Sequence, residues 1–188
     1  MRRLAVILET VHAAALGVWL GGAVMTAVTA ALIFPLMKDL DPALPGFAEY
    51  PHGHGVIAAG WVMARVFAWY DALQMVCGTL AALTLAWRLL IRRHAPVRRA
   101  AWRSAALLVT AAVTVSYLLL IAQPMHADLT GFWEAAQAGQ VERADSLRAS
   151  FDARHPAASR AMSVIALSVL VSLVLALLSE PKPAEETT

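Results

Sequence analysis

Six arginines lie between residues 88 and 103, in a stretch without acidic residues, and long apolar segments flank this stretch on both sides. Lys and Arg collect in short cytoplasmic loops of membrane proteins because they are translocated poorly. The arrangement therefore predicts a multi-pass membrane protein whose 88–103 segment faces the cytoplasm. The inverted orientation is the alternative, and it would place all six arginines on the translocated side.

Four apolar segments are long enough to be membrane spans, at about residues 4–36, 56–91, 104–123 and 161–179. About 20 residues cross the hydrocarbon core, so the last two segments fit and the first two are too long. The first two are expected to tilt, or to project on the outer side. The spans form one membrane domain, residues 1–179, with both termini cytoplasmic and a disordered tail at 180–188.

The composition supports this class of protein. The chain is 60% hydrophobic and 15% charged, whereas soluble domains are about 25% charged. The chain has a net charge of +2, and outside the 88–103 stretch its basic residues are not clustered enough to indicate a nucleic-acid surface. The first apolar segment follows two arginines, as in a signal peptide, but Glu9 and His12 interrupt it and it is too long. It is therefore expected to be a retained first span.

The two connections on the outer side differ in character. Residues 37–55 contain three prolines and three glycines and read as an ordered loop. Farther along, Asp128 or Thr130 is expected to cap a short amphipathic helix that Gly139 ends, and a second one follows up to Pro156. These short helices between spans three and four are expected to lie on the membrane surface or to cap the bundle. The predicted fold is an all-α, four-helix membrane bundle.

Small residues on the first span predict close helix packing. Ala13, Gly17 and Gly21 recur every four residues and form a GxxxG face. Such faces allow helix backbones to approach closely in lipid, within the bundle or between copies.

Ionisable side chains within the spans are the candidate intramembrane site, because each is costly in lipid unless it faces the bundle or water. Glu9 and His12 share one face of the first span, and Asp71 and Gln74 share one face of the second. The functional interpretation is a polar pathway or a proton- or ion-binding pair. The structural alternative is a polar cluster that holds the helices in register.

His12 is also a candidate haem ligand, but it is the only histidine within a span, so two histidine ligands are not expected. The remaining arrangement pairs His12 with Met75 or Met63. A metal site is a separate hypothesis. Four histidines are assigned to the outer side, and their imidazoles would suit copper or zinc: His52, His54, His126 and His155.

Three stretches of the sequence resemble a known family. They are HAAALGVWLGGAVMTAV followed by IFPLM in the first span, AGWVMARVFAWYDALQMVCG in the second, and an arrangement of Pro124, Phe151 and His155 before the last. Together they resemble the bacterial members of the transmembrane-protein-205-like domain family, and the WLGG motif is also similar to one in copper-resistance D-type membrane proteins. The resemblance implies a four-helix inner-membrane protein and carries over no catalytic residues.

No nucleophile lies at a recognisable spacing from a base, so an enzyme is not expected. The leading hypothesis is a non-enzymatic inner-membrane module that acts as a small subunit or structural partner in a homo-oligomer or larger assembly. The alternatives are a copper- or zinc-binding or transport protein that uses the outer histidines, and a haem-binding electron-transfer subunit.

Overall fold

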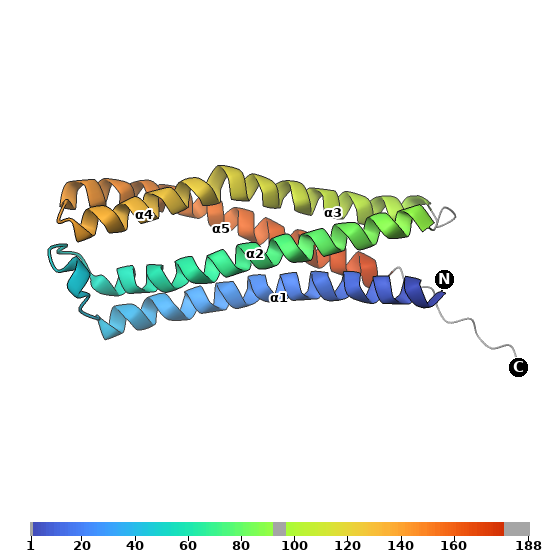
Figure 1. Ribbon diagram of the computed structural model, residues 1–188, viewed down its shortest axis with the longest axis horizontal. Coiled ribbons are helices and arrows are strands. Elements are labelled where there is room, and N and C mark those ends of the chain that lie inside the picture. The colour runs from blue at the N-terminus through green and yellow to red at the C-terminus, as the bar shows by residue number, and fades with distance from the viewer. Residues whose placement is uncertain (1, 92–96, 179–188) are drawn as a thin grey trace, which may run out of the picture.

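The computed structural model describes residues 2–91 and 97–178, and its regular structure there is entirely helical. In chain order the elements are α1 (Arg2–Leu40), the 3-10 turn η1 (Pro45–Phe47), α2 (His54–Ile91), α3 (Val97–Tyr117), the π turn η2 (Leu118–Ala122), α4 (Gln123–Gln137) and α5 (Val141–Leu177). Because α3, η2 and α4 follow one another without a break, the chain forms four long helical rods (Figure 1). The predicted all-α, four-helix bundle is confirmed.

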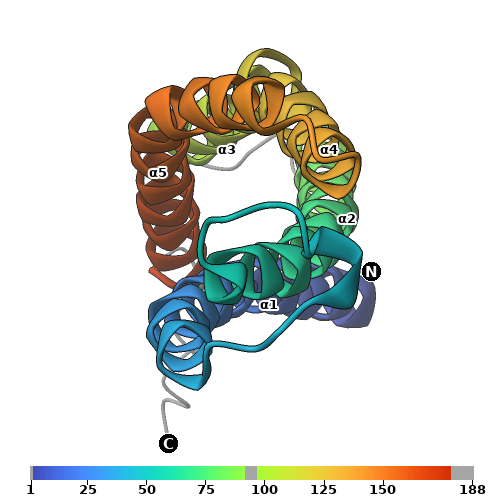
Figure 2. The same ribbon diagram turned by 90° about the vertical axis from the view of Figure 1, so that its left-hand side faces the viewer.

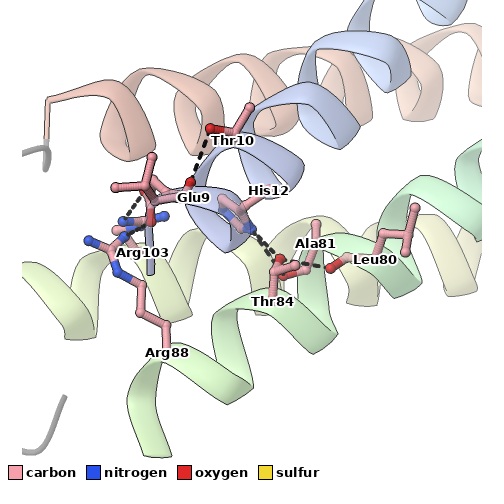
Figure 3. A network of polar contacts seen from close by, with 9 residues as sticks. Glu9, Thr10, His12, Leu80, Ala81, Thr84, Arg88 and Arg103 are labelled. Carbon is pink, nitrogen blue, oxygen red and sulfur yellow. Dashed lines mark hydrogen bonds and ion pairs between the residues drawn. The ribbon is translucent and has the colours of Figure 1, made fainter. Parts of the chain in front are cut away.

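The rods pack as two antiparallel hairpins. One consists of α1 and α2, the other of α3–α4 and α5, and α5 also packs against α1 (Figure 2). We call the end where α1 begins and α2 ends the arginine end, because Arg88 and Arg103 lie there (Figures 1 and 3). The opposite end, where residues 41–53 connect α1 to α2, is the loop end.

Each rod is long and apolar enough to cross a membrane: Arg3–Leu40, His54–Arg88, Ala101–Gln137 and Val141–Leu177. Their outward faces carry large apolar side chains, and one residue from each rod illustrates this. Leu32, Leu83, Leu108 and Leu167 are all more than 60% exposed. Soluble proteins rarely expose apolar surface on this scale, whereas lipid covers it in a membrane protein. The fold therefore has the features of a multi-pass membrane protein.

The expectation of separate short helices between spans three and four is wrong. The first of them continues span three as α4, and the second is the opening part of the 37-residue helix α5. Asp128 and Thr130 therefore lie inside α4 instead of capping it. Pro124 lacks a backbone N–H and its ring crowds the preceding turn, and the wider π turn at 118–122 accommodates it. Pro156 likewise lies inside α5 without ending it.

As a result, all four rods reach the loop end, not only the first two. The predicted bounds of the first two spans lie within a few residues of α1 and α2. The predicted tail at 180–188 and two arginines of the 88–103 stretch, Arg92 and Arg93, lie outside the described residues.

Two local conformations end the helices at the loop end. Asp41 has a φ of 39°, and its N–H bonds to the Met37 carbonyl, which ends α1 before Pro42. Gly139 has a φ of 68°, and the Gln140 N–H bonds to the Ala135 carbonyl at 2.9 Å. The second arrangement is a Schellman motif, in which glycine adopts the left-handed conformation at least cost. The predicted helix end at Gly139 is confirmed.

The buried side chains form two cores. The main core lies between the four rods and is centred on residues such as Leu16, Trp19, Ile165 and Val169. The loop-end core joins residues 44–57 to the α4–α5 hairpin through seven buried side chains, Phe47, Tyr50, Ile57, Phe132, Ala135, Ala136 and Ala144. The second core explains why the proline- and glycine-rich connection is ordered.

Candidate functional site

A buried carboxylate bound by two arginines is the most unusual polar feature of the described chain (Figure 3). Glu9 of α1 forms an ion pair with Arg88 of α2 and a second one, at 2.9 Å, with Arg103 of α3. Neither carboxylate oxygen accepts an aligned hydrogen bond from a described residue, so the contacts are mainly electrostatic. Glu9 thereby connects the α1–α2 hairpin to α3 of the other hairpin at the arginine end.

His12 extends this network toward the middle of the bundle. Its Nδ1 lies 3.1 Å from the Ala81 carbonyl oxygen and 3.0 Å from Thr84 Oγ1 (Figure 3). A carbonyl only accepts hydrogen bonds, so Nδ1 carries the proton. The Thr84 hydroxyl in turn donates to a backbone carbonyl of its own helix, Leu80 or Ala81. The predicted Glu9/His12 pair therefore lies in the core, and each residue has separate partners.

From the sequence, Arg88 and Arg103 indicate only the orientation of the spans, and Thr84 is not among the candidate site residues. The available signal was the depth of Glu9, two turns into the first span. An acidic residue at that depth needs a cation on a neighbouring helix. The 88–103 stretch supplies six candidate arginines, but the sequence does not show which of them reach Glu9.

The alternative of a haem held by His12 and a methionine is not supported by the positions of the two methionines. His12 touches α2 at Ala81, and Met63 is 18 residues away along the same helix, about 27 Å at 1.5 Å per residue. Met75 is about 9 Å away along α2 by the same rise, and it is 50% exposed on the outside of the bundle. One iron atom cannot reach His12 and Met63 together.

Asp71 and Gln74 are the second predicted intramembrane pair, and they contact each other. Gln74 Nε2 donates to Asp71 Oδ1 at 2.8 Å, and Gln74 is 1% exposed. Within the described chain, its Oε1 has no hydrogen-bond partner. Such groups are uncommon in protein cores because each costs free energy when it is desolvated.

The predicted packing face on α1 is not the one that the protomer uses. A Cβ atom added at Gly17 or Gly21 would meet nothing within 4 Å. The close contacts are made instead by Gly22, whose added Cβ would lie 2.7 Å from Leu73 Cδ2, and by Gly78, which lies against the Trp19 ring. Within the protomer, the Gly17–Gly21 face therefore remains without a partner.

The four outer histidines do not come together. His54 is held by the loop, because Nδ1 accepts from the Leu44 N–H at 3.0 Å and Nε2 lies 3.0 Å from the Phe47 carbonyl. His52 lies 3.5 Å from Asp145, and His126 and His155 are exposed on α4 and α5. No three His, Cys, Asp or Glu side chains of residues 2–91 and 97–178 are grouped closely enough to hold a metal ion.

Tyr50 ties the loop to the second hairpin at the loop end. Its hydroxyl donates to Asp145 Oδ1 at 2.7 Å, and its ring packs edge-on against Phe132 with 5.6 Å between centroids. Burial raises the pKa of Tyr50 above its ordinary value, and the hydrogen bond to Asp145 raises it further. The phenol is therefore stabilised in its protonated form.

This raised pKa predicts a loss of stability at alkaline pH. The free energy of unfolding should carry the full contribution of Tyr50 below pH ~10, the ordinary tyrosine pKa. The contribution should decline above that pH, because the unfolded chain releases the proton first. In Tyr50→Phe this part of the alkaline decline should disappear, as measured by thermal unfolding in detergent across pH. Equal alkaline declines in both proteins would contradict the prediction.

The fold defines a four-helix bundle with four candidate membrane spans. Comparison of the chain with models of protein families, with curated proteins and with solved structures found no match. What the protein does must therefore be inferred from its own residues.

Proposed function

We propose that this chain is a non-catalytic integral membrane module that assembles with further copies of itself, or with other membrane subunits, in the inner membrane of a bacterium. The proposal includes cytoplasmic termini and membership of the transmembrane-protein-205-like domain family. The four candidate spans and their apolar outward faces support the location in a membrane. The arginine-rich 88–103 stretch supports the orientation.

The observation that carries the assembly role is the unoccupied face of α1. Gly17 and Gly21 lie about 100–160° around α1 from the buried Leu16 and Trp19, at 100° per residue. Ala13 is half-buried at the edge of this face, because it lies three residues before Leu16. Folding of the protomer does not use this face, because nothing approaches an added Cβ at either glycine. Small residues at such a face allow a second helix to pack closely and gain dispersion contacts in lipid.

Cysteine cross-linking in isolated membranes tests the assembly role. Gly21→Cys should form a disulfide-linked dimer on mild oxidation, because the proposed interface brings two copies of this position together. Leu167→Cys, on the exposed face of α5, should cross-link far less, and native Cys77 is buried. Equal cross-linking at the two positions would indicate random collision and would count against the proposed interface.

A second pair of variants separates assembly from folding. Gly17→Leu should abolish the Gly21→Cys dimer without lowering the unfolding temperature of the detergent-solubilised protomer, since an added Cβ at Gly17 meets nothing within 4 Å. Gly22→Leu should lower that temperature, because the new side chain would collide with Leu73 and Tyr70. If Gly17→Leu unfolds the protomer instead, this face belongs to the fold and not to an interface.

A further inference from the structure

The buried network at the arginine end carries an excess of positive charge. Glu9 is the only carboxylate that pairs there with described residues, and it faces two guanidinium groups. Arginine remains protonated in proteins, so among the described residues of this network one positive charge has no carboxylate partner. Arg103 is 6% exposed, and its Nε and Nη2 have no hydrogen-bond partner among the described residues. A desolvated cation of this kind is costly unless an anion approaches it.

Access to the network is through Arg88. Its side chain is 20% exposed, whereas that of Arg103 is 6% exposed. An anion at the surface can therefore contact Arg88 directly while attracted by the charge of both guanidinium groups. Glu9 pairs with both guanidinium groups, so one further monoanion would make this group of charges neutral.

Two tryptophans indicate the depth of the arginines in the bilayer. Trp87 and Trp102 immediately precede Arg88 and Arg103, and they are 48% and 62% exposed. Exposed tryptophan at the end of a membrane span typically lies at the level of the lipid headgroups. The arginine pair therefore lies where phospholipid phosphates are found, at the end of the bundle whose connecting segment is rich in arginine.

We propose that Arg88, which shares the Glu9 carboxylate with the buried Arg103, binds the phosphate group of an anionic phospholipid. A phosphodiester carries a single negative charge, which matches the excess charge of the network. The planar guanidinium presents paired N–H donors that fit two oxygens of one phosphate. Basic pockets at the cytoplasmic side of membrane helices recognise such headgroups by the same chemistry. This site is independent of the α1 face through which assembly is proposed.

Native mass spectrometry of the full chain tests this site. After delipidation and titration with dioleoylphosphatidylglycerol, the protein should retain one lipid with saturable affinity. Arg88→Gln should weaken that binding by about tenfold or more, the effect of losing charge-assisted hydrogen bonds. This variant should fold, because it leaves the Glu9–Arg103 pair intact and electrically balanced. An unfolding temperature in detergent close to that of the native chain would show that the variant is folded, whatever the lipid result.

The matched control is Arg3→Gln, which removes an exposed arginine from the same end of α1. It should leave the retained lipid unchanged. Equal losses in Arg3→Gln and Arg88→Gln, or no loss in either, would overturn the proposal, since binding would then reflect diffuse charge or other residues. A second experiment adds excess inorganic phosphate to the lipid-bound protein. If it binds alone and displaces the lipid with the same dependence on Arg88, the site takes free phosphate, and the assignment to lipid is wrong.

Discussion

Glu9→Gln is expected to destabilise the protein by about 3–5 kcal/mol, the range measured when one partner of a buried ion pair is removed. The substitution leaves the size of the side chain almost unchanged and removes only its charge. Two guanidinium groups would then face each other at the arginine end without the carboxylate that separates them. Unfolding in mixed micelles with increasing sodium dodecyl sulfate measures the change in free energy.

Two further variants test the electrostatic cause. Glu9→Gln/Arg103→Gln should recover much of the lost stability, because it removes the more deeply buried cation as well. Thr10→Ala alters an exposed neighbour on α1 and should change the stability by less than about 0.5 kcal/mol. The electrostatic explanation fails if the double variant is less stable than the single one by the full cost of a second, independent substitution.

Gly55→Ala should also be strongly destabilising, by about 3 kcal/mol, at the upper end of typical overpacking costs. An added Cβ at this position would lie 2.2 Å from the Met37 carbonyl oxygen and 2.8 Å from its carbonyl carbon. These are backbone atoms of α1, so no side-chain rotation relieves the clash. The first turn of α2 would have to move away from the end of α1, which would disturb the loop-end core.

Gly53→Ala is the matched control, two residues earlier in the same His-Gly-His-Gly segment. Nothing lies within 4 Å of an added Cβ at Gly53, and the residue does not have a positive φ. Its unfolding temperature should stay close to that of the native chain or rise slightly, because alanine restricts the unfolded state. Equal destabilisation by the two substitutions would show that the segment responds to the loss of glycine in general, and not to the contact with α1.

The difference between these two glycines illustrates what the sequence conceals. Both belong to the 37–55 segment that the composition predicts to be an ordered loop, but Gly55 lies in the first turn of α2, and of the two only Gly55 makes a close backbone contact. On α1, the GxxxG spacing directs attention to Gly17 and Gly21, while the protomer packs on the adjacent Gly22. Small residues permit close approach, but the side of the helix that faces a neighbour depends on how the rods are rotated.

The network around Glu9 was predictable only in part. The sequence places an acidic residue inside the first span, which calls for a partner in the bundle. It does not reveal which cations reach Glu9, since Arg88 and Arg103 lie on separate helices and four further arginines lie between them. The contact between Asp71 and Gln74 could be predicted from the sequence, because residues three apart on one helix are neighbours wherever the helix packs.

The sequence by itself determined the number of long helices, their approximate bounds in the first half of the chain, and the end of α4 at Gly139. These follow from local properties: continuous apolar runs, and residues that end a helix through their own backbone preferences. Only the tertiary structure decided that α4 and α5 extend the bundle, that the outer histidines lie apart, and that two arginines share one carboxylate. Each of these depends on the rotation and relative height of helices that are distant in the sequence, and side-chain packing between the rods sets both.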